Sequence, residues 1–469
     1  MSARVNWILL SNAMLGSFLT GAAVRIFHVA MPTVASSLET DVIGVSWAVL
    51  AFQLASIGLS LIFGRIGDLY GHYRVYGAGY LVVTLGSLLC GLSTTIAQLI
   101  GFRALQGVGA AMTQSVGRVL AAEAMPEEKG GRAQGLMTTA FHSGFLLGPS
   151  LGGLIIDYMG WRWSFFFLVP FGVLGLVLTL PRMRRSAPVA RRPSVDYVGS
   201  ALLLASAAAL TVLLDRRTMA RLSTGSQLFL ALLFTGSFAG FLLREASTPS
   251  PIVNLSLFKI RMFTFSTLSL LIVSTNYTLS GFILPFYLQE VLRLSPSFMG
   301  LLFMAAPIFT VSLGPVSGYL SDRVGPRLPA TAGAALLTVS IFLGTLLRVD
   351  SHWLLPTLIM ALLGLANGFF NPANSVGMIN SVPKGHMGFA TGTLNLMFGM
   401  GNLLGISLAS FLMTTAFQIH TAIPGALPNP AHPIPFVAAL NYTFLVATGI
   451  GLLAVVTSVM RGRRMGPEG

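Results

Sequence analysis

Two short, glycine-rich connectors hold the charged side chains best suited to a conformational latch. The first runs from Gly64 to Arg74 with the sequence Gly-Arg-Ile-Gly-Asp-Leu-Tyr-Gly-His-Tyr-Arg, and a weaker copy runs from Gly318 to Arg327. A carboxylate at a helix end accepts hydrogen bonds from a neighbouring helix N-terminus and pairs with a nearby guanidinium, while glycine lets backbones approach closely. Plain turn formation would use the same residues. We expect a latch that closes one face of the molecule, formed by Gly64, Arg65, Asp68, Gly71, Arg74, Asp322 and Arg323.

A second group of polar side chains lies within a hydrophobic segment that covers residues 97–125. At 100° per residue, Arg103, Gln114 and Arg118 fall within about 60° of one another on one face of a helix. A guanidinium in hydrocarbon costs at least a few kcal/mol, so these arginines should face a cavity or a partner. An ion pair that joins this helix to a neighbour is the alternative interpretation.

Basic groups also occur in the first hydrophobic segment, where Arg25 and His28 lie one helical turn apart. With no acidic residue near the middle of these segments, the arginines predict a cavity of positive potential that would favour a carboxylate or phosphate. Buried packing is the alternative role for each histidine. The candidates for proton coupling or substrate binding are Arg25, His28, Arg103, Gln106, Gln114, Arg118, Glu123 and His142.

The composition is that of a membrane protein. Hydrophobic residues make up 54% of the 469 positions and charged residues only 9%, whereas soluble domains carry about a quarter charged residues. The formal net charge of +14 comes from Lys and Arg in short loops, which favours an orienting role over nucleic-acid binding. The single cysteine, Cys90, can form no internal disulfide, and we expect no metal site.

Apolar runs separated by charged, Pro or Gly residues predict an all-α polytopic protein with 14 transmembrane helices. Lys and Arg are concentrated in alternate loops, so we expect both termini in the cytoplasm and a multi-pass protein of the plasma (inner) membrane. The predicted spans are 7–35, 43–63, 75–95, 97–125, 133–156, 161–181, 197–215, 225–243, 262–286, 297–320, 329–348, 353–375, 389–415 and 437–460.

An internal repeat divides the chain into two related halves. Six small or helix-breaking residues, Pro126, Gly131, Ala133, Gly135, Gly144 and Gly148, recur at one constant offset as Pro383, Gly388, Ala390, Gly392, Gly401 and Gly405. Pro- and charge-rich inner segments flank the seventh and eighth spans, which therefore look inserted. We predict a six-helix bundle over 1–182, a linker and inserted helix pair over 183–256, and a second six-helix bundle with a short tail over 257–469.

These motifs together resemble the major facilitator superfamily, in its 14-helix drug:proton antiporter branch, over essentially the whole chain. The residues that carry the resemblance are the connector Gly64 to Arg74, the segments Arg103 to Gly107 and Gly144 to Gly153, and Gly160-Trp161-Arg162-Trp163-Ser164-Phe165-Phe166. The resemblance implies a major facilitator fold of two six-helix bundles plus the inserted pair. It also implies a role in proton coupling for Arg103.

The resemblance gives a further role to the glycines of the fifth span and exposes one departure. In the antiporter branch, this motif bends the fifth span against the second bundle; ordinary small-residue packing is the alternative. The motif residues here are Gly144, Gly148, Pro149, Gly152 and Gly153.

The branch usually carries an aspartate about ten residues before a proline that ends the first span. Here Ala22 stands in that place before Pro32, which puts the usual coupling site in doubt.

The resemblance implies a secondary active transporter that performs proton-coupled efflux of amphipathic small molecules by alternating access. An alternative is transport of an organic anion or anionic lipid through Arg25, Arg103 and Arg118, and a remote alternative is a non-transporting sensor or scaffold. No cluster suited to an enzyme and no P-loop appear in the sequence. We expect no cofactor beyond the proton gradient, a small-molecule substrate and membrane lipids as partners, no nucleic acid, and a monomer.

Overall fold

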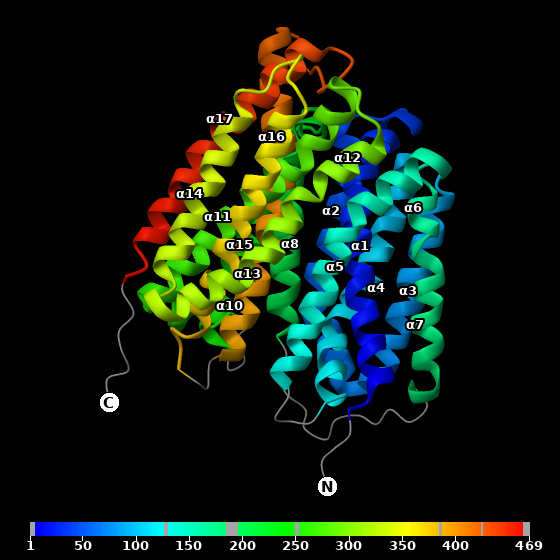
Figure 1. Cartoon of the computed structure of the whole chain (residues 1–469), viewed down its shortest axis with the longest axis vertical. Coiled ribbons are helices and arrows are strands. Elements are labelled where there is room, and N and C mark those ends of the chain that lie inside the picture. Colours follow the sequence, from blue (N-terminus) through cyan, green and yellow to red (C-terminus); the bar gives the residue numbers. More distant parts are fainter. Residues whose placement is uncertain are drawn as a thin grey trace. The chain divides into compact units, whose positions relative to one another are not determined.

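The computed structural model describes residues 5–125, 130–183, 196–248, 253–383, 387–423 and 425–462. Within these ranges the regular structure is helical, and no strand occurs. Helices follow one another with short connections, and those of each unit run side by side (Figure 1). This confirms the predicted all-α class. The described chain forms two compact units.

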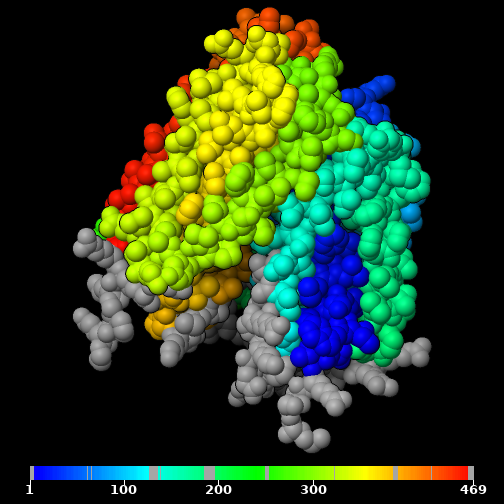
Figure 2. Space-filling model, viewed as in Figure 1, coloured from blue at the N-terminus to red at the C-terminus, as the bar shows by residue number. Residues whose placement is uncertain are grey.

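The first unit contains residues Met1–Leu204 together with Ser295–Leu301. Inside it, α1 packs along α5, and α2 and α3 both pack along α4. In Figure 2 the blue surface of α1 lies between the surfaces of α5 and α7. Its helices are α1 (Trp7–Ser37), α2 (Val42–Tyr70), α3 (His72–Leu92), α4 (Ile96–Glu123), α5 (Gly130–Met159), α6 (Trp163–Phe166) and α7 (Leu168–Met183).

The second unit contains Ala205–Leu294 and Leu302–Gly469. Two helices cross the division: α8 (Tyr197–Leu213) and α12 (Pro296–Phe303) each begin with residues of the first unit. The predicted three-part division of the chain stays a prediction. The remaining elements are α9 (Arg216–Arg221), α10 (Thr224–Ser247), the 3-10 helix η2 (Leu255–Lys259), α11 (Arg261–Phe286), the π-helix η3 (Tyr287–Val291), α13 (Ala305–Val324), α14 (Arg327–Gly344), α15 (Leu354–Ile379), α16 (Met387–Thr421) and α17 (Pro433–Val459).

Each of the fourteen predicted spans coincides with one helix or with two consecutive helices of the described chain. By length and composition, 12 helices of the described residues are apolar enough to cross a membrane. The other two are α4, which carries two arginines, and α8, which is a shorter apolar helix. The count of fourteen membrane spans therefore stays a prediction.

Large apolar side chains cover the outer faces of these helices. Only 11% of the most apolar 18-residue stretch of α10 is buried inside the protein, and the Leu243 side chain is 72% exposed. Such a surface is stable only in contact with lipid or another apolar surface. In the interior, by contrast, polar side chains link helices: the Tyr80 hydroxyl donates to the carbonyl of Asn12 at 2.7 Å, and the Asn12 amide donates to Thr179 Oγ1 at 2.8 Å.

The glycines of α5 let it lie directly against α1. A Cβ atom added at Gly144 would contact the carbonyl oxygen of Phe18 and would lie 2.7 Å from the amide nitrogen of Ala22. At Gly148 it would lie 2.9 Å from Arg25 Cβ, and at Gly152 it would lie 3.2 Å from the Cα of Ile26. This stripe therefore packs α5 against a helix of its own unit.

The end of the same motif contacts the start of α12. A Cβ at Gly153 would meet the carbonyl oxygen of Pro296, and Asp157 Oδ2 accepts a hydrogen bond from the amide of Ser297 at 2.8 Å. These α12 residues belong to the first unit. Pro149 lies inside α5, and its carbonyl oxygen faces Gly300. Bending of the fifth span against the second bundle stays a prediction.

We predict that Gly144→Ala lowers the thermal stability of the purified protein in detergent, by about 1–3 kcal/mol, because its Cβ would overlap the α1 backbone. Gly449→Ala is the matched control, since a Cβ there meets nothing within 4 Å. Alanine favours helices more than glycine does, so the control should be neutral or slightly stabilising. Equal melting temperatures for the two variants would contradict the close α1–α5 packing.

Candidate functional site

Arg103, on α4, is enclosed within the first unit, where it contacts α1 and α2. It is only 1% exposed, and its guanidinium lies between two aromatic rings, 4.5 Å from the centroid of Phe27 and 4.3 Å from that of Phe52. Its Nε donates to the carbonyl oxygen of Ala48 at 3.3 Å, and its Nη1 donates to Gln106 Oε1 at 2.6 Å. The aromatic faces and the two acceptors stabilise the buried cation.

Gln106 extends this network to α3. Its Nε2 donates to Ser87 Oγ at 2.8 Å, and the Ser87 hydroxyl donates to the carbonyl of Val83 at 2.7 Å. Arg103 and Gln106 therefore join α4 to α1, α2 and α3. In this structure they act on the helices of the first unit rather than on an open surface.

The predicted polar stripe on α4 is divided in the structure. Arg103 is enclosed, Gln114 is half-buried and Arg118 is exposed. Arg103 and Arg118 therefore have different surroundings in this structure, and a cavity lined by both stays a prediction. Helical periodicity places the two side chains on one face, but the rise per residue separates them by about 22 Å along the axis, where different neighbours surround them.

Removing Arg103 should destabilise the first unit. Arg103→Ala removes the donor to Gln106 Oε1 and the second hydrogen bond to the Ala48 carbonyl, and opens a gap between two rings, so we expect a loss of about 2–4 kcal/mol. Val119→Ala on the same helix, at a side chain that is 38% exposed, is the control, with an expected change within about 0.5 kcal/mol. Thermal unfolding in detergent measures both, and an Arg103→Ala protein as stable as the control would disprove the core role.

A half-buried cationic and aromatic patch lies at the junction of α1 and α5. The Arg25 guanidinium lies 4.5 Å from the centroid of the Phe145 ring. Phe145 also contacts Phe141, with centroids 4.8 Å apart, and His142, with centroids 6.3 Å apart. We call Arg25, Phe141, His142 and Phe145 the α1–α5 patch. A guanidinium beside aromatic faces is suited to a planar ring or an anionic group.

His28 does not share this patch, although it is only three residues from Arg25. The His28 side chain is 5% exposed, whereas Arg25 is half-buried. Ala22, which replaces the acidic residue of the antiporter branch, is 2% exposed and lies against Gly144. Of the predicted first-span groups, Arg25 is therefore the one that keeps an accessible surface.

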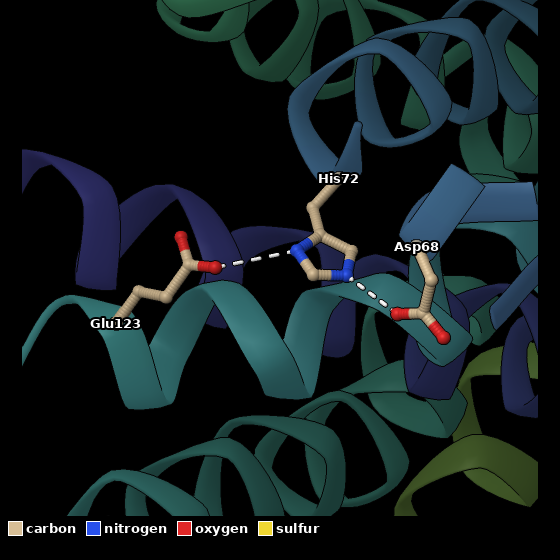
Figure 3. Close-up of polar contacts among 3 residues, drawn as sticks. All are labelled: Asp68, His72 and Glu123. Carbon is tan, nitrogen blue, oxygen red and sulfur yellow. Dashed lines mark hydrogen bonds and ion pairs between the residues drawn. The ribbon is translucent and has the colours of Figure 1, made fainter. Parts of the chain in front are cut away.

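A second candidate site joins the ends of three helices of the first unit, as Figure 3 shows. His72, the first residue of α3, lies between Asp68 near the end of α2 and Glu123 at the end of α4. Its Nε2 lies 3.0 Å from Asp68 Oδ1, and its Nδ1 lies 3.2 Å from Glu123 Oε1. Gly71, which separates α2 from α3, has a φ of 99°, a conformation that favours glycine.

The geometry of His72 couples this cluster to protonation. A neutral imidazole has one N–H group and can donate to one carboxylate, whereas the imidazolium has two and can donate to both. Other polar side chains occur close by in the same part of the first unit. Tyr73 and Arg74 follow His72 on α3, and Arg182 on α7 donates from one guanidinium nitrogen to Asn6 Oδ1 at 3.4 Å. The three-helix contact is complete only when His72 is charged.

The structure describes the side-chain contacts of only some residues of the predicted latch. Arg74 Nε donates to the carbonyl of Met183 at 3.4 Å, and the Arg323 guanidinium lies over the Tyr319 ring at 4.6 Å. The side chains of Arg65 and Asp322 lie outside the described residues. The sequence interpretation did not include His72, although its spacing of four from Asp68 across a glycine is a usable signal. Closure of one face by these residues stays a prediction.

Protonation of His72 should stabilise the protein. The Asp68 and Glu123 side chains are 33% and 43% exposed, so we expect a contribution of only about 0.5–1 kcal/mol. Free histidine titrates near pH 6.5, so the contribution should be full below about pH 6.5 and lost as rising pH removes the second ring proton. Melting temperatures of wild type and His72→Gln should thus differ at pH 6 and converge at about pH 8.5.

His420→Gln, at an exposed histidine of the second unit, is the control. A gap between wild type and His72→Gln that stays constant with pH would contradict the charge argument.

Comparison with protein families decides the class of the protein. The family model described as Major Facilitator Superfamily matches residues 13–273 and 266–468. The chain belongs to the major facilitator superfamily. It is therefore a multi-pass integral membrane protein and a secondary transporter rather than an enzyme.

Several curated relatives resemble the chain over most of its length. The riboflavin transporter RibZ of Clostridioides difficile is 26% identical over 467 residues, which cover 98% of each chain. The multidrug resistance protein Stp of Mycobacterium tuberculosis is 29% identical over 430 residues, 89% of this chain and 78% of Stp. The putative multidrug resistance protein MdtD of Cronobacter sakazakii is 29% identical over 404 residues, 85% of this chain and 84% of MdtD. Two of these three relatives are thus named as multidrug resistance proteins.

Solved structures share the fold at low sequence identity. A bacterial homologue of the human lysosomal transporter Spinster matches 98% of both chains with a TM-score of 0.68 at 13% identity. The peptide transporter POT in complex with sulfate matches 96% of this chain and 94% of its own with a TM-score of 0.67 at 14% identity. These matches support the major facilitator fold.

Proposed function

We propose that the protein exports amphipathic small molecules across the plasma membrane by alternating access, in exchange for protons. Both termini would lie in the cytoplasm, and the proton gradient would be the energy source of a monomeric transporter. The resemblance to Stp and MdtD over most of the chain supports a drug-type substrate. The observation that carries the proposal is the half-buried α1–α5 patch, because it offers an aromatic and polar surface near the middle of two long helices.

The patch also suits a substrate that carries a negative charge. Arg25 is half-buried and lies in the middle of α1, where an organic anion would replace water around the guanidinium. A carboxylate or phosphate would accept two hydrogen bonds from it, and a planar ring would stack on Phe145. The riboflavin transporter RibZ, similar over nearly its whole length, makes a planar heterocycle a reasonable member of the substrate panel.

The test is flux in proteoliposomes that contain the purified protein and an imposed pH gradient. The panel should include lipophilic cations, organic anions and riboflavin. Proton movement evoked by lipophilic cations supports drug:proton exchange, and movement evoked only by anions supports the second candidate. Folded protein that moves neither protons nor any member of the panel would contradict the proposed drug-type substrate.

Arg25→Gln distinguishes the two substrate classes. If the guanidinium holds the anionic group, the variant should transport organic anions at least about tenfold less efficiently, because the loss of one charge-assisted hydrogen bond weakens binding by about that factor. Cation-evoked proton movement should persist. Arg162→Gln is the matched control, because Arg162 also lies on an aromatic ring, that of Trp161 at 4.4 Å, but follows the end of α5. Unchanged anion transport by Arg25→Gln would exclude Arg25 from the substrate site.

A further inference from the structure

Arg461 is a buried arginine in the second unit whose charge is not balanced by the described residues. It follows the end of α17 and is 1% exposed. Its Nε, Nη1 and Nη2 atoms are all buried, and no described residue accepts a hydrogen bond from them. The guanidinium lies 5.3 Å from the centroid of the Phe370 ring on α15. Compared with Arg103, it has a ring but no acceptor within the described part of the chain.

Two more buried polar atoms without a partner among the described residues lie along the same face of α15. Asn374 is one turn after Phe370, and its Oδ1 accepts no hydrogen bond from that part of the chain, although its Nδ2 contacts the sulfur of Met378 at 3.7 Å. A Cβ added at Gly377, three residues further, would lie 3.4 Å from Ser266 Oγ of α11. The Ser266 hydroxyl likewise has no partner in the described ranges.

The surroundings add positive charge. Arg261 Nε donates to the carbonyl of Met460 at 2.8 Å, so a second guanidinium lies beside the residue that precedes Arg461. Thr331 and Ser458 hydroxyls lie 3.3 Å apart, which brings the start of α14 to the end of α17. Arg327 is one turn before Thr331. A buried charge without a counter-charge is costly unless an anion joins it.

We propose that Arg461, Ser266 and Asn374 form a binding site for an oxyanion that carries or adjoins a hydroxyl group. The guanidinium and the serine hydroxyl would donate to the anionic oxygens, and Asn374 Oδ1 would accept from the hydroxyl. Hydrogen phosphate has both features, and so does the phosphodiester of a glycerol-headed lipid with its headgroup hydroxyls. The site belongs to the second unit and involves none of the α1–α5 patch. The site lies beside the turn after α17, where Gly462 has a φ of 86°, and an anion would enter through local opening of this helix end.

The first experiment compares Arg461→Met with wild type in detergent, in phosphate-free chloride buffer and then with inorganic phosphate at equal ionic strength. Without the anion, the variant should melt at the same or a higher temperature, because methionine removes an uncompensated buried charge. With phosphate at about ten times its Kd, wild type should gain about 1–3 °C and the variant nothing. Arg293→Met, at a side chain 74% exposed, should respond to phosphate as wild type does.

A second variant supplies the counter-charge from within the protein. Asn374→Asp would place a carboxylate on the α15 face that meets Arg461, so it should raise the melting temperature in phosphate-free buffer and remove the response to phosphate. This variant keeps the side-chain volume almost unchanged. An Asn374→Asp protein that is less stable than wild type and still responds to phosphate would contradict the proposed arrangement.

The source of the anion is distinguished in bilayers. Nanodiscs of phosphatidylcholine alone are compared with nanodiscs that also contain phosphatidylglycerol, for wild type, Arg461→Met and Arg293→Met. Stabilisation of wild type by phosphatidylglycerol but not by free phosphate identifies a lipid headgroup, and stabilisation by phosphate in both media identifies the free anion. An equal response by Arg461→Met, or no response of wild type to either anion, overturns the site.

Discussion

Hydrocarbon offers no hydrogen bonds, and this constraint governs the structure of the chain. Every backbone N–H and C=O group in the apolar layer must be hydrogen-bonded within the protein. An α-helix forms these bonds within one segment, and the apolar segments of this chain are therefore helical. Many hydroxyl groups follow the same rule by donating to the carbonyl one turn earlier, as Thr20 does to Gly16 at 3.0 Å and Thr84 does to Tyr80 at 2.6 Å. The fold is thus first a solution to the pairing of polar groups.

Close helix packing then decides which polar groups remain accessible. The stripe of small residues on α5 brings its backbone against α1, so that Gly148 lies beside the Cβ of Arg25. The Arg25 side chain lies over Phe145 at this junction and is half-buried. A larger residue at Gly148 would move the patch as well as the helix. Packing and the candidate substrate surface therefore depend on the same glycines.

Three arginines show how the environment of one side-chain type separates its roles. Arg103 is buried with two rings and two acceptors, which suits a permanent contact between helices. Arg25 is half-buried over one ring, which suits contact with a ligand that binds reversibly. Arg461 is buried with a ring and no described acceptor, which suits an anion that stays bound. Residue type is the same in all three cases, and the neighbours differ.

The sequence by itself determined the class of the protein, the position of its helices and the residues of the main motifs. Length and apolarity set the helices, since a span must cross about 30 Å of hydrocarbon. The connector predicted from Gly64 to Arg74 is instead helical up to Tyr70, and Gly71 alone separates α2 from α3. Only the tertiary structure decided that His72 joins two carboxylates, that Arg103 and Arg118 have separate surroundings, and that Arg461 is buried beside a helix about ninety residues earlier in the chain. Periodicity gives the direction in which a side chain leaves its own helix, whereas charge balance and accessibility depend on which other helices occupy that direction.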